Sequence, residues 1–158
     1  IKVFFSELDY RYDLIEASLD NKNLNPYLIN NKLLILSKFI GSSEGKEFLL
    51  AYKRLFSIVP KECQTSEVKL SLLKETEEIE LFKLCSMTEK IFATKKWEVF
   101  IQTKNIISFT KPINQFLDKL KVNIEDIQLK KNRINLLIRC IEILNLFFKF
   151  YEIEKNEI

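Results

Sequence analysis

The scarcity of glycine constrains this chain most, because its 158 residues include only two glycines, together with three prolines. Average proteins contain about 7% glycine and about 5% proline. A β-sandwich, a Rossmann unit and a phosphate-binding P-loop each need several glycines at turns or beside phosphates. These classes are therefore excluded within this segment, and the composition indicates a helical protein.

Helical periodicity runs through most of the chain, and no long stretch alternates with the period of two that is typical of strands. Asn25 is expected to N-cap a helix that has Pro26 at its first position and Gly41 at C′. Other helices are expected over residues 1–8, 13–20, 43–59, 67–86, 95–109, 111–120 and 125–154. We therefore predict an all-α helical bundle of two packed helical subdomains, without a sheet.

The chain contains no histidine, which removes the usual general base, histidine metal sites and the serine and cysteine nucleophile systems that need this residue. An acidic cluster at Glu75, Glu77, Glu78 and Glu80 resembles a carboxylate metal site, but bundle di-iron sites also need Glu-x-x-His motifs. A solvated acidic helix face is the better interpretation. We predict no catalytic residue and no metal ligand.

Three widely spaced cysteines, Cys63, Cys85 and Cys140, form no Cys-x-x-Cys pair. They are expected to be reduced and mostly buried, as in a cytoplasmic protein. No apolar run approaches the ~18 uncharged residues that span a bilayer, and no secretory leader opens the chain, so no membrane contact is expected. Because the first residue is Ile1 rather than methionine, we expect a piece of a longer protein.

The positive charge is concentrated in the central part of the sequence. The whole chain carries a net charge of +3, but residues 90–139 hold 11 Lys and Arg against 4 Asp and Glu, a net +7. The segments on either side each carry −2. This asymmetry indicates a polyanionic partner such as RNA, although lysines also cover the solvated faces of ordinary helices.

The candidate RNA-binding residues combine cations for phosphates with an aromatic ring for unstacked bases. They are Lys95, Lys96, Trp97, Lys104, Lys130, Lys131 and Arg133. Two of them have a specific structural alternative: Trp97 could be a large core side chain, and Arg133 could pair with a carboxylate such as Asp118.

Four segments of the chain resemble the motifs of one known family. Residues 111–122, Lys-Pro-Ile-Asn-Gln-Phe-Leu-Asp-Lys-Leu-Lys-Val, are similar to the Pro-Val-Asp-x-Phe-Phe-Asp-x-Val-x-Val element of bacterial glycyl-tRNA synthetase β subunits. Residues 132–137, Asn-Arg-Ile-Asn-Leu-Leu, resemble its Asn-Arg-Leu-x-Leu-Leu. Residues 52–58 and 78–81 resemble its Lys-Arg-Val-x-Asn-Ile and Glu-x-x-Leu elements. The chain departs from these patterns at Ser57, Glu77, Leu117 and Leu120.

This resemblance implies a DALR-type anticodon-binding helical domain over residues 64–158, preceded by a helical segment over residues 1–63. It implies a parent enzyme, glycine–tRNA ligase, that joins glycine to its tRNA with ATP and magnesium. In that family the aminoacylation site belongs to the α subunit, so this chain is expected to hold no cofactor. Its expected partners are glycine-acceptor tRNA, bound around the anticodon loop, and the α subunit.

Two alternatives stay open. Arginyl-tRNA synthetase has a related DALR domain, although residues 52–58 and 112–122 fit the glycyl β subunit better. A chain with thirteen phenylalanines could instead be a non-enzymatic helical module that binds a protein partner through a hydrophobic groove. RNA binding through several phosphates weakens steeply between about 50 and 200 mM salt, whereas an apolar interface does not.

Overall fold

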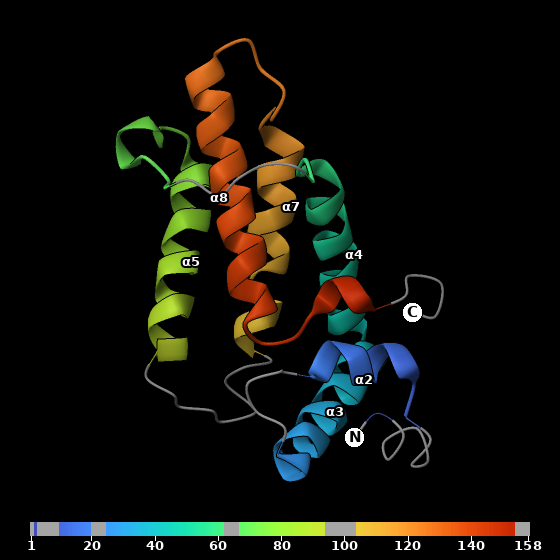
Figure 1. Cartoon of the computed structure of the whole chain (residues 1–158). Helices are drawn as coiled ribbons and strands as arrows, with labels where there is room; N and C mark the ends of the chain where they lie inside the picture. Colours follow the sequence, from blue (N-terminus) through green and yellow to red (C-terminus); the bar gives the residue numbers. More distant parts are fainter. Residues whose placement is uncertain (1, 3–9, 20–24, 62–66, 94–103, 154–158) are drawn as a thin grey trace.

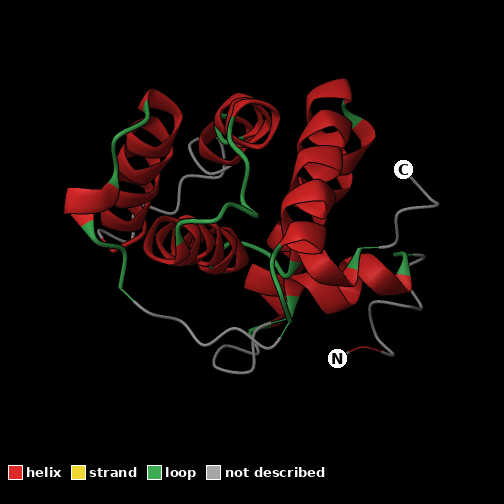
Figure 2. Cartoon of the chain, turned by 90° about the horizontal axis from the view of Figure 1, so that it is seen from above, coloured by secondary structure: helices red, strands yellow, loops and turns green. Residues whose placement is uncertain are grey.

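The computed structural model describes residues 2, 10–19, 25–61, 67–93 and 104–153. Within these ranges all regular structure is helical, which confirms the predicted all-α class (Figure 2). The α-helices are α2 (Tyr12–Ser18), α3 (Pro26–Gly41), α4 (Ser43–Ile58), α5 (Thr76–Ala93), α7 (Thr110–Lys119) and α8 (Ile127–Asn145). Two short 3-10 helices, η1 (Leu70–Leu72) and η2 (Phe150–Glu152), complete the order.

Helices α4, α5, α7 and α8 form a bundle in which α7 and α8 each pack against α4 and α5, and α2 and α3 lie at one end of it (Figure 1). Contacts join α5 to α7 and α8, α4 to α7 and α8, and α3 to α2 and α4. None of the described helices is long and apolar enough to cross a membrane.

Local capping signals begin several of these helices. The Asn25 side chain accepts a hydrogen bond from the backbone N–H two residues later at 3.0 Å, and Pro26 is the first residue of α3, as predicted. Ser42 caps α4, and Asp126 caps α8 by accepting from two backbone N–H groups at 3.1 and 3.2 Å. Each cap satisfies N–H groups that have no partner within their own helix.

The junction between α3 and α4 explains where glycine is needed. Gly41 is the last helical residue of α3, not the predicted C′ residue, and Ser42 follows it in an extended conformation. The close approach occurs instead at Gly45, where an added Cβ would lie 1.7 Å from the carbonyl oxygen of Phe39. Glycine is therefore required at residue 45 because the first turn of α4 packs directly on the backbone at the end of α3.

One hydrophobic cluster runs through the described helices, and five aromatic side chains form its part beside η2. The ring centroid of Phe150 lies 5.0 Å from that of Phe48, 5.4 Å from Tyr52, 5.8 Å from Phe148 and 6.5 Å from Phe39. The cluster includes residues on both sides of the expected boundary after residue 63, and the division into two subdomains stays a prediction.

The last long helix is shorter than predicted, because α8 ends at Asn145 rather than near residue 154. After a turn, the Lys149 N–H donates to the Ala17 carbonyl at 2.9 Å and ties the chain to α2. In a continued helix, residues 148 and 150 would point about 200° apart. The turn lets both Phe148 and Phe150 enter the core, so tertiary packing overrides the helical pattern here.

The predicted helix over residues 67–86 is also wrong at its start, because α5 begins at Thr76. The Asn132 side chain of α8 accepts from the Lys69 N–H at 2.7 Å and donates to the Lys69 carbonyl at 3.1 Å. In a helix that started at residue 67, the Lys69 carbonyl would instead accept from the backbone N–H four residues later. The segment before α5 is therefore held across α8 by one amide side chain. Expected helical residues 1, 3–8 and 95–103 lie outside the described residues.

Candidate nucleic-acid interface

The structure separates the candidate RNA-binding residues that it describes. Lys95, Lys96 and Trp97 lie outside the described residues. Lys104 is exposed in the helical turn that precedes α7, whereas Lys130 and Lys131 lie in the first turns of α8. Because α7 and α8 run antiparallel, these positions fall at opposite ends of the bundle (Figure 1).

Lysines gather on both sides of the turn that joins α7 to α8. Lys121 and Lys131 are exposed, and the ammonium group of Lys130 donates to the Asn123 side chain at 3.0 Å. Lys119 forms an ion pair with Glu77 at 3.3 Å. We call Lys119, Lys121, Lys130 and Lys131 the basic turn. It presents several cations at one end of the bundle, as phosphate contacts require.

Arg133 points into the protein and not towards this surface. Its Nη1 donates to the Lys121 carbonyl at 2.7 Å, and its Nη2 lies 3.5 Å from Oε1 of Glu78. The side chain is 10% exposed, and that of Glu78 is 1% exposed. This geometry favours the structural role, but the predicted partner was wrong: Asp118 pairs with Arg54 at 2.7 Å instead.

The acidic cluster is not simply a solvated face. Glu75 and Glu80 are exposed as predicted, but Glu78 is buried and Glu77 is half-buried beside Lys119. The sequence prediction failed for Glu78 because its partner, Arg133, lies on a distant helix. Among the described residues, no group of three His, Cys, Asp or Glu side chains is placed to hold a metal ion.

The described cysteines are free and buried, as predicted, while Cys63 lies outside the described residues. Burial raises the pKa of the Cys140 thiol well above its usual range, and the neighbouring thiol of Cys85 raises it further. A thiol with a raised pKa is a poor nucleophile near neutral pH because only the thiolate reacts.

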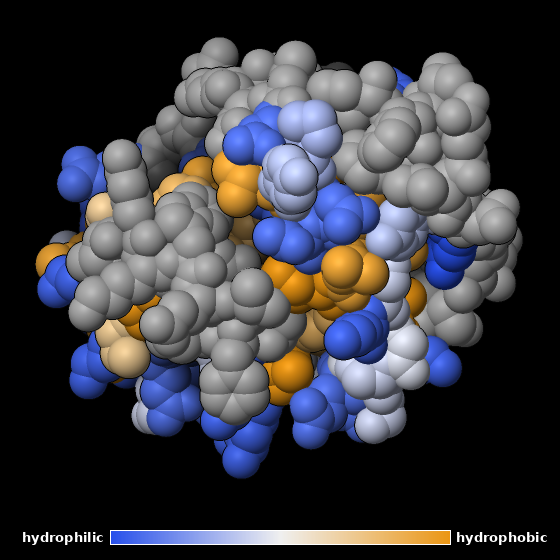
Figure 3. Space-filling view, turned by 90° about the horizontal axis from the view of Figure 1, so that it is seen from below, coloured by the Kyte–Doolittle hydropathy of each residue, from blue (hydrophilic) through white to orange (hydrophobic). Residues whose placement is uncertain are grey.

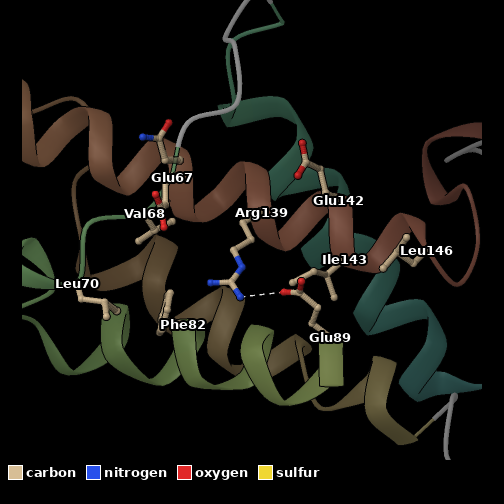
Figure 4. A pocket seen from close by; sticks show the side chains of 10 residues that line it. Glu67, Val68, Leu70, Phe82, Glu89, Arg139, Glu142, Ile143 and Leu146 are labelled. Carbon is tan, nitrogen blue, oxygen red and sulfur yellow. Dashed lines mark hydrogen bonds and ion pairs between the residues drawn. The ribbon is translucent and has the colours of Figure 1, made fainter. Parts of the chain in front are cut away.

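A groove of about 660 Å³, which sequence reasoning did not find, lies between α5, α8 and the segment before η1 (Figure 4). Arg139 reaches from α8 towards α5, where its Nη2 lies 2.9 Å from Glu89 and its guanidinium carbon 4.8 Å from the centroid of the Phe82 ring. Val68 and Leu146 add apolar lining. Residues so far apart in the chain meet only through packing, so no local signal could reveal the groove.

Comparison with known proteins supports an RNA-binding assignment. The family model of the DALR anticodon binding domain matches residues 48–157. Proteins named glycine–tRNA ligase β subunit are similar: that of Rickettsia typhi is 33% identical over 93% of this chain and 22% of its own length. Those of Buchnera aphidicola and Aquifex aeolicus are each 32% identical, over 88% and 94% of this chain and 21% and 22% of their lengths.

The chain thus spans about a fifth of the length of the curated relatives it matches. The family match covers α5, α7, α8 and most of α4, and includes the basic turn, the groove and the buried Glu78–Arg133 pair. The chain therefore belongs to the DALR anticodon binding domain family.

Proposed function

We propose that this chain is the part of a glycine–tRNA ligase β subunit that binds glycine-acceptor tRNA around the anticodon loop. The observation that carries this proposal is the DALR match over residues 48–157, together with the names of the relatives. These names also favour the glycyl system over the arginyl alternative.

The parent enzyme would join glycine to tRNA with ATP and magnesium, in the cytoplasm and in assembly with an α subunit. The chemistry would take place outside this chain, whose task is to hold the tRNA. Two features support this division: the chain has no histidine, and burial raises the pKa of the Cys140 thiol, which makes it a poor nucleophile.

The basic turn is the surface that we assign to the RNA backbone. Lys121 and Lys131 are exposed. The ammonium group of Lys119 pairs with Glu77, and that of Lys130 donates to Asn123. Lysines fix the register of an RNA through its phosphates, whereas side chains that reach unstacked bases supply specificity.

The first test compares tRNAs. We expect the full chain to bind glycine tRNA more tightly than an unrelated tRNA in a filter-binding assay. If four lysines contact phosphates, affinity should fall about 50- to 150-fold between 50 and 200 mM salt, because bound counterions are released.

Two outcomes would contradict this proposal. Equal binding of all tRNAs at every salt concentration removes the glycine assignment, and a preference for arginine tRNA supports the arginyl alternative. The protein-interaction alternative predicts binding that salt barely changes. Apolar side chains do reach the surface at the end of the molecule shown in Figure 3, where hydrophilic side chains flank them.

A second test concerns the basic turn. We expect the double substitution Lys130→Ala and Lys131→Ala to weaken binding of all RNAs about tenfold, since an exposed charge contact contributes up to about 1 kcal/mol. The slope of log affinity against log salt should fall by about two units. Lys38→Ala with Lys46→Ala removes the same charge from exposed positions on α3 and α4 and serves as the control. If the variant with Lys130→Ala and Lys131→Ala binds RNA with wild-type affinity, these lysines do not contact the RNA.

A further inference from the structure

We propose that the groove between α5 and α8 takes one unstacked nucleobase that carries an exocyclic amino group, with Arg139 and Phe82 as its platform. The inference rests on the proposed function and names a base-reading site for it. The groove is separate from the basic turn, which we assign to phosphates.

The platform is a cation–aromatic pair. The guanidinium group of Arg139 lies 4.8 Å from the centroid of the Phe82 ring and is fixed by Glu89 at 2.9 Å and by Ser86 at 3.4 Å. The Arg139 side chain remains 28% exposed. Proteins hold unstacked RNA bases against such guanidinium and aromatic planes.

The walls suit a planar apolar ligand with polar edges. Val68, Ile143 and Leu146 line the groove, and Leu146 is 43% exposed, so apolar surface is available to a base. Binding sites for small planar groups combine such walls with a few convergent polar side chains. Here the polar groups come from three different segments of the chain.

Carboxylates on the rim select the edge of the base. Glu67, Glu89 and Glu142 line the groove, and Figure 4 shows Glu67 and Glu142 on either side of Arg139. A carboxylate accepts a hydrogen bond from an exocyclic amino group, as when Glu or Asp reads the N4 amine of cytosine. Uracil has a carbonyl oxygen at that position. Both this oxygen and the carboxylate are acceptors, so no hydrogen bond forms between them.

Exposed lysines on α5 and α8 are available to the phosphates on either side of such a base. Lys83 and Lys90 are exposed on α5 and directly follow Phe82 and Glu89 in the sequence. Lys131 is exposed on α8, eight residues before Arg139, a rise of about 12 Å along the helix. A strand could therefore place a base in the groove while its phosphates meet lysines, although the groove itself is rimmed by carboxylates.

The experiment compares matched variants on matched RNAs. Wild-type full chain, Arg139→Leu and Glu142→Gln are titrated with glycine tRNA, and with RNA hairpins that differ only in loop cytosines or uracils. Arg54→Leu is the control for Arg139→Leu, because Arg54 is also a half-exposed arginine in an ion pair. Glu47→Gln, at an exposed site on α4, is the control for Glu142→Gln.

We expect wild type to bind the cytosine loop about tenfold more tightly than the uracil loop. Arg139→Leu should weaken binding of glycine tRNA about tenfold, and Glu142→Gln should reduce the cytosine preference, while both controls behave as wild type. The salt slope should not change, because no phosphate contact is removed.

The results separate this inference from the proposed function. If wild type prefers glycine tRNA but Arg139→Leu binds it equally well with the same loop preference, the groove assignment is wrong and a polypeptide becomes its better occupant. If wild type binds no tRNA selectively, both proposals are overturned.

Discussion

Replacing Glu78 with alanine is expected to lower the free energy of unfolding by about 3–5 kcal/mol, because it leaves Arg133 as an unpaired buried charge. The carboxylate lies 3.5 Å from the Arg133 guanidinium and is 1% exposed. It also accepts from the Glu75 N–H at 3.3 Å, which closes the first turn of α5 in the manner of a capping box. Urea unfolding followed by circular dichroism measures the change.

Two companion variants show whether the buried pair causes the loss. Glu80→Ala removes an exposed carboxylate two residues away, and should cost less than about 0.5 kcal/mol. The double substitution Glu78→Met and Arg133→Met should recover most of the stability, since apolar residues of similar volume often replace a buried ion pair without loss. A Glu78→Ala protein as stable as Glu80→Ala would show that the pair is not buried in solution.

The sequence predicts those helix boundaries that depend on residues close to them in the chain. The Asn25-Pro26 start of α3 and the end of α4 just before Pro60 follow from capping chemistry and from the missing N–H of proline. The all-α class likewise followed from the shortage of glycine and from helical periodicity. These features depend on neighbours within a few residues, which a single sequence displays.

The failures share a different cause, which is contact between distant segments. The local sequence assigns Glu78 to a charged surface, because the partner that buries it, Arg133, lies 55 positions away on α8. Helix α5 starts later than its sequence pattern predicts because the Asn132 side chain binds the backbone of Lys69, and α8 ends earlier than predicted because Phe150 packs against α4. No periodicity within one segment reports such pairings.

The candidate site also combines features that the local sequence predicts with features that only the fold creates. Charge counting indicates the basic segment over residues 90–139, which contains the basic turn, and it selects Lys130 and Lys131 because they are adjacent in the sequence. It also placed Arg133 among them, although its hydrogen bond to Lys121 and its ion pair turn it inward. The groove around Arg139 is lined by residues of α5, α8 and the segment that Asn132 binds. These segments meet only in the folded chain, so the sequence alone does not predict the groove.

Phe150→Ala is expected to cost about 3–5 kcal/mol, since it removes a fully buried ring from the centre of the aromatic part of the core. Phe48, Tyr52 and Phe148 each lie within 6 Å of its ring centroid and would line the cavity left behind. The substitution also weakens the hold of η2 on α2 and α4, which contact it. The midpoint of urea unfolding measures the cost.

The neighbouring residue supplies the control for this prediction. Tyr151→Ala also removes an aromatic ring from η2, but Tyr151 is 41% exposed and stacks on the half-exposed Phe56 at 6.2 Å. Its loss should cost less than half as much, because less apolar surface leaves a buried environment. Equal costs at the two positions would mean that the turn after α8 does not insert Phe150 into the core. A cost confined to Phe150 would instead show that this turn closes the bundle by burying one ring and leaving the next at the surface.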